Sequence, residues 1–442
     1  MGPTVDPVPS EERIPARADV VIVGGGIVGA STALYLAQRG VSVALCEKGH
    51  IAGEQSSRNW GWVRKARRDP REIPLIVESL RLWENMNTQV QGETGFRRTG
   101  IVFAAESDED VARYETWLGH ARPYQIDARL VSGPQLEQVM PGSGGRWKAA
   151  LYCATDGRAE PQKAAPAIAA AARREGAAIL TDCAVRGVER SGGKVSAVIT
   201  EHGRIACDTV VVSAGAWSRR FLKDLGLTLP QLKVRASVMR TTPVEGAPEA
   251  ALWCNGFAFR KRLDGGYNIA NGHVNVVPIV PDSFRFFGKF LPAFLMDTKS
   301  LKLRLDGRFG QERREAEPVP LDQVSPYEKT RVLDPKPDSK YLREALDDLA
   351  KMYPAFASAK VAQEWAGLID VTPDAIPVIS TVESVPGLII ATGFSGHGFG
   401  IGPGAGRLIA DLATGAPPIV DPKEFRFSRF SDGTRVRPIA GI

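Results

Sequence analysis

The sequence predicts an α/β protein made of two interleaved domains, and three observations carry this prediction. Residues 18–46 contain an apolar strand, a glycine-rich turn, a helix and a second apolar strand. Short strands return at 184–213, and a last apolar strand followed by glycines returns at 387–403. Strand-like runs and loops fill the stretches between these returns. We therefore expect a mainly parallel sheet assembled from distant segments, interleaved with a second domain built on an antiparallel sheet.

The composition is that of an ordinary globular protein, with 43% hydrophobic and 24% charged residues among 442. It excludes collagen, coiled coil and intrinsic disorder. The net charge of +6 is spread along the chain, and its densest cluster is Arg64, Lys65, Arg67, Arg68 and Arg71. No zinc-finger spacing or RNA-recognition motif accompanies it, so no nucleic-acid partner is expected.

The cysteines and the first residues bear on location. Five cysteines are an odd number, and none forms a CxxC pair. Because no apolar leader precedes them, we expect reduced thiols, a cytoplasmic location and no metal site. The polar, proline-rich residues 1–17 predict a flexible tail. Residues 18–37 are interrupted by Asp19 and three glycines, so no transmembrane span is expected.

The glycine-rich turn carries the first chemical signal. Gly24, Gly26 and Gly29 form a GxGxxG motif between the strand at 18–23 and a helix expected at 31–39, which Gly40 closes. These glycines permit a tight turn, close approach of a pyrophosphate, and packing of the helix on the strand. Glu47 ends the second strand, where its carboxylate can accept hydrogen bonds from a ribose. Together they predict a Rossmann-like dinucleotide-binding domain.

Two features favour FAD over NAD as the dinucleotide. The polar loop 48–58 follows Glu47 in place of another strand and helix, and it can run beneath an extended cofactor. A second glycine cluster at 393–402 precedes a helix expected at 404–414, which Gly415 caps. The positive end of that helix can stabilise negative charge on a reduced flavin. The cofactor-binding residues that we predict beside Gly24, Gly26, Gly29 and Glu47 are Ile27, Val28, Lys48, Gln55, Ser56, Ser57, Arg58, Val185, Ala214, Gly215, Trp217, Gly396, Gly398, Phe399, Gly400 and Ile401.

The remaining elements outline the domains. Helical periodicity predicts helices at 73–87 and 161–176, and strands at 177–180, 184–189, 195–200 and 209–213 form a meander that rejoins the first sheet. We assign 18–91, 151–226 and 363–442 to the FAD-binding domain, and 92–150 and 227–362 to the substrate domain. An insertion at about 278–340 is aromatic and basic at its start. Its aromatics either pack on the core or form a lid or membrane-surface contact.

These motifs resemble those of the D-amino-acid oxidase/glycine oxidase superfamily of FAD-dependent amine oxidoreductases. The resemblance rests on the first strand–helix–strand unit, residues 213–218, 365–367 and 372–374, and the last glycine-rich turn. Within it, residues 52–56, 182–189, 379–383 and 386–388 are similar to the Proteus-type L-amino acid deaminases. The resemblance implies oxidation of L-amino acids to 2-imino acids, which hydrolyse to 2-oxo acids and ammonia. Large apolar or aromatic side chains are expected to be favoured, with O2 as electron acceptor and a homo-oligomer possible.

The sequence departs from those deaminases in three ways. They carry an N-terminal membrane anchor, and we expect none here. Gly272 stands where their substrate-carboxylate arginine falls. Relatives with covalent flavin use a cysteine near the last glycine-rich turn, but no cysteine follows Cys254, so non-covalent FAD is expected.

A carboxylate substrate needs a cation and an apolar wall. Arg64 follows the loop expected under the flavin and is our candidate clamp, held by stacking on Trp60 and Trp62. Arg235 and Arg240 are the next candidates. The other residues expected to line the catalytic cavity are Trp217, His273, Trp365 and His397.

Three alternatives remain open from the sequence. One is a D-amino acid, glycine, sarcosine or opine oxidase or dehydrogenase of the same superfamily. Another is a flavin-binding assembly subunit without activity, and the weakest is an NAD-dependent dehydrogenase.

Overall fold

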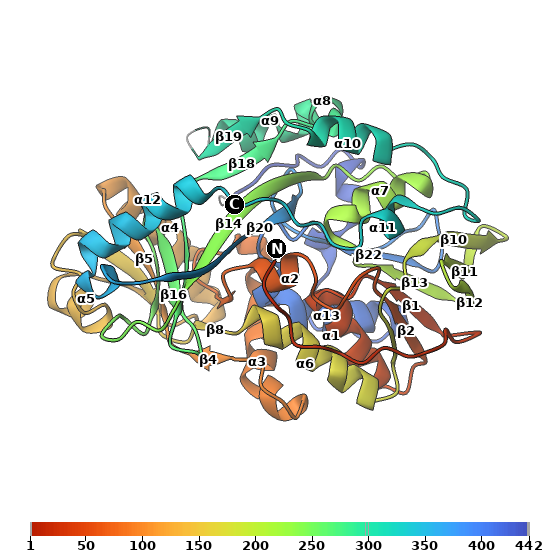
Figure 1. Cartoon of the computed structure of the whole chain (residues 1–442), viewed down its shortest axis with the longest axis horizontal. Coiled ribbons are helices and arrows are strands. Elements are labelled where there is room, and N and C mark those ends of the chain that lie inside the picture. Colours follow the sequence, from red (N-terminus) through yellow and green to blue (C-terminus); the bar gives the residue numbers. More distant parts are fainter. Residues whose placement is uncertain (1, 297, 299, 440–442) are drawn as a thin grey trace.

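The computed structural model describes residues 2–296, 298 and 300–439, and its core is built on two large sheets (Figure 1). The smaller has six strands in the order β21-β22-β13-β1-β2-β9. Its neighbours pair in parallel, except that β21 is antiparallel to β22. The strands are β1 (Val20–Val23), β2 (Val43–Cys46), β9 (Ala178–Leu180), β13 (Thr209–Val212), β21 (Val378–Thr381) and β22 (Leu388–Thr392). The predicted return of distant strands to one sheet is confirmed.

A layer of helices packs against this sheet: α1 (Ile27–Ala37), α3 (Ile73–Gln89), α6 (Pro161–Arg174) and α13 (Gly398–Thr414). Two of them begin earlier than predicted, α1 directly after Gly26 and α13 at Gly398. The glycines of α13 allow it to pack closely on its neighbours. A Cβ atom on Gly406 would lie 2.4 Å from Ser31 Cβ, and one on Gly404 would lie 2.8 Å from Ser79 Cβ. Gly415 closes α13 with φ +68°, as expected.

Two strands of the predicted meander, β10 (Val185–Ser191) and β11 (Lys194–Thr200), form a sheet of their own with β12 (Gly203–Ala206), which was not predicted. They are antiparallel in that order, whereas the predicted strands at 177–180 and 209–213 are β9 and β13 of the six-stranded sheet. A second three-stranded sheet joins β3 (Trp62–Val63), β8 (Gly157–Arg158) and β4 (Arg97–Arg98). α2 (Gln55–Arg58) comes after β2, and α7 (Ser218–Asp224) comes after β13.

The larger sheet has ten strands and receives both ends of the long segment 227–371. β14 (Leu232–Thr241) and β20 (Val361–Val371) pair antiparallel along their lengths. The other members are β5 (Ile101–Ala105), β6 (Ala128–Val131), β7 (Ala149–Cys153), β15 (Ala251–Trp253), β16 (Ala258–Lys261), β17 (Tyr267–Ala270), β18 (Asn275–Pro278) and β19 (Leu301–Arg304). β20 differs from our division, which placed 363–371 in the first domain, because its register with β14 fixes it in the larger sheet. The domain boundaries themselves stay a prediction.

Helices α4 (Asp108–Ala121), α5 (Gly133–Val139) and α12 (Ser339–Met352) accompany the larger sheet. No helix in the described ranges combines the length and apolarity needed to cross a bilayer.

The first residues are not the flexible tail that their composition predicted. Asp6 and Glu11 donate backbone hydrogen bonds to the carbonyls of Gln162 and Ile179, and Arg17 forms a bridge with Ala206. Asp6 and Glu11 also form ion pairs with Lys163 and Arg173. These contacts fix residues 6–17 along the first domain, although they contain no regular element.

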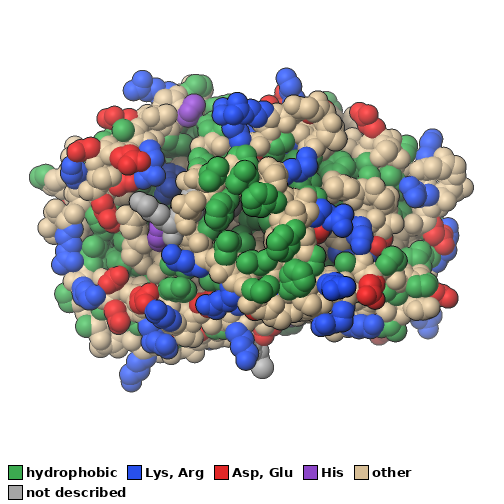
Figure 2. All heavy atoms as spheres, turned by 90° about the horizontal axis from the view of Figure 1, so that it is seen from above, with side chains coloured by type: hydrophobic (Ala, Val, Ile, Leu, Met, Phe, Trp, Pro, Cys, Tyr) green, Lys and Arg blue, Asp and Glu red, His purple; other side chains and the backbone are tan. Residues whose placement is uncertain are grey.

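The insertion contains α8 (Pro281–Arg285), α9 (Phe287–Met296), β19, α10 (Arg308–Glu315) and α11 (Pro326–Lys329). Its first elements, α8 to α10, lie along the upper edge of the molecule in Figure 1. Phe286 packs into the core, but Phe284 is 70% exposed and Phe287 63% exposed. Of the two alternatives predicted for the insertion, packing on the core is therefore correct for Phe286 but not for Phe284 and Phe287. Figure 2 shows hydrophobic side chains gathered on this face and bordered by Lys and Arg.

Candidate active site

One large cavity of about 1100 Å³ extends from the six-stranded sheet to the ten-stranded sheet. It exceeds the usual size of a pocket for one small metabolite, and so can hold a long ligand and a second, smaller one. The first glycine motif and Glu47 line it, as do the last glycine-rich turn and residues of the larger sheet. The predicted motifs, up to about 375 residues apart in sequence, therefore face one space.

The first glycine motif and Glu47 shape one part of the cavity. The Glu47 carboxylate accepts the backbone N–H groups of Gly25 at 2.7 Å and of Gly49 at 2.8 Å. Its burial raises its pKa. Gly26 is the N-cap residue of α1 and has no side chain with which to cap the helix, although the Ser56 hydroxyl accepts the Ile27 N–H at 2.9 Å. The N-terminus of this helix faces the cavity. Gly29 serves packing instead, because a Cβ there would lie 2.0 Å from the Gly24 carbonyl oxygen.

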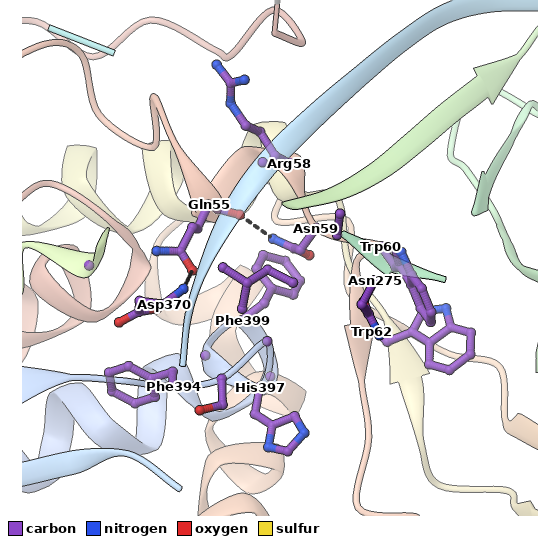
Figure 3. Close-up of a pocket in the computed structure, with 18 of the residues that line it drawn as sticks. Gln55, Arg58, Asn59, Trp60, Trp62, Asn275, Asp370, Phe394, His397 and Phe399 are labelled. Carbon is purple, nitrogen blue, oxygen red and sulfur yellow. Dashed lines mark hydrogen bonds between the residues drawn. The ribbon is translucent and has the colours of Figure 1, made fainter. Parts of the chain in front are cut away.

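Most of the predicted cofactor-binding residues line this cavity, and three do not. Those that line it are Gly24, Gly26, Ile27, Val28, Glu47, Lys48, Gln55, Ser56, Arg58, Val185, Ala214, Gly215, Trp217, Gly396, Gly398, Phe399 and Gly400. Ser57 and Ile401 are buried outside it, as is Gly29. Arg58 points its guanidinium away from the other labelled residues (Figure 3) and binds the Asp334 carboxylate at 2.7 Å and the Ala366 carbonyl at 2.8 Å.

The two predicted tryptophans differ in position. Trp217 lines the cavity near its Glu47 end, where its indole N–H donates to Glu54 at 3.1 Å and Lys48 Nζ lies 4.8 Å from its ring centre. Trp365 is not a wall of the cavity, which corrects our prediction. It is 1% exposed, packs with Val238 and Ala270, and donates its indole N–H to the Arg58 carbonyl at 3.0 Å.

The last glycine-rich turn brings His397 to the cavity at the N-terminus of α13 (Figure 3). His397 Nδ1 lies 2.9 Å from Glu72 Oε2, and both side chains are buried. Burial lowers the pKa of His397, although the Glu72 carboxylate acts in the opposite direction. The imidazole is therefore held neutral near pH 7, with its Nδ1 side committed to Glu72.

An aromatic region lined by Trp60, Trp62, Phe103 and Trp253 forms another part of the cavity, and His273 lies in its wall. Trp60 and Trp62 pack edge to face on each other, with ring centres 5.2 Å apart. Arg64 faces this region with its guanidinium carbon 5.4 Å from the ring centre of Phe103. The predicted stacking of Arg64 on Trp60 and Trp62 is replaced by this contact with Phe103. Burial, followed by the charges of Arg68 and Arg67, lowers the pKa of Arg64.

The fallback candidates for the clamp lie elsewhere. Arg235 binds the Asp338 carboxylate with Nη2–Oδ2 at 2.9 Å. Arg240 lines a separate pocket beside Arg262 and Asp264. Neither is among the residues that line the large cavity.

Comparison with known proteins assigns most of the chain to one protein family. The family model described as FAD dependent oxidoreductase matches residues 19–412. The chain belongs to this family. Among solved structures, this FAD-dependent oxidoreductase is similar to the L-amino acid deaminase of Proteus myxofaciens in complex with anthranilate, at 33% identity and a TM-score of 0.93, covering 98% of this chain and 97% of that one. The deaminase of Proteus vulgaris gives 33% and 0.92, covering 97% and 100%.

Curated relatives of this FAD-dependent oxidoreductase carry other substrate names. Glycine oxidase of Pseudomonas putida is 25% identical over 417 residues, which cover 92% of this chain and 97% of that protein. The sarcosine oxidase subunit beta of an Arthrobacter species is 26% identical over 423 residues, covering 94% and 91%. The family and its FAD are therefore shared, whereas the substrates of the relatives differ.

The residues present fit the FAD that the family uses. The N-terminus of α1, a carboxylate at the end of β2 and a second helix N-terminus behind glycines face the same elongated space. Each supplies the charge or donor that a pyrophosphate, a ribose or a flavin ring requires.

We expect Glu47→Ala to weaken FAD retention roughly 10- to 100-fold, the usual effect of removing a hydrogen bond to a charged group. The variant also leaves the N–H groups of Gly25 and Gly49 without their acceptor. Apparent Kd values from flavin fluorescence on titration of the apoprotein measure the change. Such titration is possible because FAD is predicted to be non-covalent, and heating should release it intact.

The control for this prediction is Asp208→Asn, which removes an exposed carboxylate paired with Arg17 outside the cavity and should leave the Kd unchanged. FAD that precipitates with the heated chain would contradict non-covalent binding. A normal Kd in Glu47→Ala would contradict the role of the carboxylate.

Sequence reasoning missed several residues of the site. Glu72 and Asp370 carry no local motif, and their roles follow only from contacts with residues far along the chain. Asp370 is buried, which raises its pKa, and it accepts the Gly393 N–H at 2.6 Å. Arg67 was visible only as one member of a basic cluster. Its place in the cavity depends on Phe103 and Trp253, which no spacing connects to it.

Proposed function

We propose that this FAD-dependent oxidoreductase oxidises the Cα–N bond of L-amino acids to 2-imino acids, which water hydrolyses to 2-oxo acids and ammonia. The observation that supports it is a half-buried cation, Arg64, in an aromatic region of the cavity that also holds the expected FAD site. The similarity in fold to two L-amino acid deaminases at 33% identity points to the same substrate class.

The residues of this chain would act by binding and orienting the substrate. Arg64 binds the substrate carboxylate through two N–H groups, which fixes the direction of the Cα–H bond. Trp60, Trp62 and Phe103 exclude water and contact a large apolar side chain. FAD, when bound, would supply a two-electron acceptor for the hydride that leaves Cα, and O2 is the acceptor that we propose for its reoxidation, with hydrogen peroxide as product. Because the amine reacts in its neutral form, no further base from the protein is required.

Anaerobic mixing with L- and D-amino acids tests the proposal. We expect L-phenylalanine and L-leucine to bleach the flavin absorbance, with D-alanine, glycine and sarcosine much slower, and admission of air to restore the colour and yield hydrogen peroxide. Rapid bleaching by sarcosine or D-alanine without response to L-amino acids would contradict it.

A second candidate function is oxidation of glycine or an N-methylated amino acid. It is favoured by the curated relatives, whose names include glycine oxidase and sarcosine oxidase. The same anaerobic screen separates the two candidates, because only the second predicts that substrates without a chiral Cα react fastest.

A further inference from the structure

The aromatic region of the cavity contains a second guanidinium, that of Arg67. Its carbon lies 5.1 Å from the ring centre of Phe103, 4.7 Å from that of Trp253 and 5.7 Å from that of Tyr114. Arg64 contacts the same Phe103 ring at 5.4 Å. Two positive charges thus share one ring and line one cavity.

Neither guanidinium has a carboxylate partner within ion-pair distance in the part of the chain that the structure describes. Several other arginines with little exposure do have one: Arg158 pairs with Glu249, Arg219 with Asp282, and Arg235 with Asp338. The neighbouring Arg68 has none either, but its guanidinium donates to the carbonyls of Arg64 and His397. Aromatic rings hold a guanidinium in place but leave its charge uncompensated. Arg64 and Arg67 are therefore poised for anions that enter the cavity.

The carboxylate whose charge acts on Arg67, that of Asp110, is already engaged. It accepts the side-chain and backbone donors of Ser107 at the start of α4 and pairs with Arg113. The cap of α4 would be lost if this carboxylate turned to Arg67.

The backbone holds Arg67 in a conformation that an unconstrained arginine avoids, with φ +58°. The turn before it is fixed by the buried Asp156, which accepts the N–H groups of Lys65 at 2.8 Å and Ala66 at 3.0 Å. The turn after it is fixed by Trp117, whose indole N–H donates to the Arg68 carbonyl at 2.8 Å. Backbone strain of this kind clusters at functional sites.

The part of the cavity wall formed by Trp253 and Gly272 cannot carry a cation at Gly272 itself. A Cβ atom at Gly272 would lie 2.1 Å from the Cys254 carbonyl oxygen, so no side chain fits at that position. Trp253 donates its indole N–H to the Gly272 carbonyl at 2.8 Å and presents its ring to Arg67. The positive charge beside this wall is thus supplied by the loop after β3, through Arg67.

We propose that Arg67 forms a second anion-binding subsite beside Arg64, so that among the amino acids oxidised those with a second carboxylate are preferred. This rests on the proposed function. The second carboxylate lies either in the side chain or on a substituent of the nitrogen. Arg64 binds the α-carboxylate and Arg67 the other one, while the aromatic rings contact the carbon chain between them.

The test compares substrates that differ in one carboxylate. L-2-Aminoadipate is paired with L-norleucine, and N-carboxymethyl-L-alanine with N-ethyl-L-alanine. We expect the diacid of at least one pair to have the higher kcat/KM, and that pair identifies the place of the second carboxylate. Arg67→Met should lower kcat/KM of the preferred diacid roughly 10- to 100-fold and that of its neutral partner less than about threefold. Arg67→Lys keeps the charge and should restore part of the loss.

A binding measurement makes the test independent of turnover. Isophthalate carries two carboxylates and benzoate one, and their Kd values follow from the change in flavin absorbance of the holoenzyme. Arg67→Met should weaken isophthalate roughly 10- to 100-fold and leave benzoate unchanged. The control Arg81→Met removes an exposed arginine paired with Glu78 outside the cavity and should change each value less than about twofold.

Equal losses for both members of each pair, or a wild type that prefers both neutral substrates, would overturn the subsite. Its failure differs from failure of the proposed function. If no amino acid reduces the flavin while isophthalate binding still depends on Arg67, the amino acid assignment fails and the anion subsite stands.

Discussion

Arg64→Ala is expected to lower kcat/KM for L-amino acids by a few hundredfold or more. The substrate carboxylate would then be buried without a partner, and breaking a buried ion pair costs about 3–5 kcal/mol. The half-buried guanidinium faces the cavity, and its backbone-directed hydrogen bond to the Ala66 carbonyl leaves other N–H groups free to bind a carboxylate. Steady-state kinetics on one L-amino acid measure the effect.

FAD content should be unchanged in Arg64→Ala, because this residue lies in the aromatic region and not beside the glycine motif. Arg98→Ala is the matched control, since Arg98 is 50% exposed and pairs with Glu84 on the surface. Near-normal kcat/KM in Arg64→Ala would show that another group binds the carboxylate. Arg235 and Arg240 would not be that group, because one is paired with Asp338 and the other lines a separate pocket.

Arg260→Met is expected to lower the free energy of unfolding by about 3–5 kcal/mol. Arg260 and Glu160 form a two-pronged ion pair, with Nη1–Oε1 at 2.7 Å and Nη2–Oε2 at 2.9 Å, and their side chains are 0% and 5% exposed. Loss of one partner leaves a buried charge. Arg260 also donates to the Trp60 carbonyl, so activity should fall together with stability. Urea-induced unfolding at pH 7 measures the stability.

The matched control is Arg97→Met, which breaks an exposed pair with Glu93 and should cost no more than about 1 kcal/mol. Equal losses in the two variants would show that burial does not strengthen the Arg260–Glu160 pair.

The same pair gives a pH dependence with a defined sign. Burial alone would raise the pKa of Glu160, but the Arg260 guanidinium outweighs it and lowers the pKa to about 2. The unfolded chain therefore binds the proton more tightly than the folded chain, and the stability contributed by Glu160 is lost as the pH falls from about 4.5 toward 2. The stability gap between wild type and Glu160→Gln should narrow over this range. A gap that is constant between pH 7 and pH 3 would contradict the assignment.

The parts of the fold that could be predicted have local causes. A buried β-branched strand followed by glycines and a helix is a pattern within 30 residues, and β1, α1 and β2 follow it. The start of α13 was missed because its glycines have low helix propensity. Close packing on Ser31 and Ser79 requires them there, and that requirement is visible only in three dimensions. The ordered course of residues 6–17 was missed for the same reason, since its partners lie on α6 and β9.

The residues of the site also divide into those that a local pattern predicts and those that depend on distant contacts. The glycine motif and Glu47 could be placed because phosphate and ribose binding impose a fixed spacing. Trp365 was placed wrongly, because a tryptophan in a buried strand can pack in a core as readily as line a cavity, and here it packs with Val238 and Ala270. Glu72 and Arg67 depend on partners hundreds of residues away or on a strained backbone angle, which composition and periodicity do not encode.

The strand order of the smaller sheet has a consequence for synthesis of the chain. β1 lies between β2, its neighbour in sequence, and β13, which begins at residue 209. At roughly 5–20 residues per second, a ribosome needs about 10–40 s between these strands. During that interval β1 has one open edge, and β22 arrives later still. We therefore expect nascent chains that end before β13 to bind chaperones and to resist proteases poorly, and protection of β1 to appear only after residue 212 has left the ribosome.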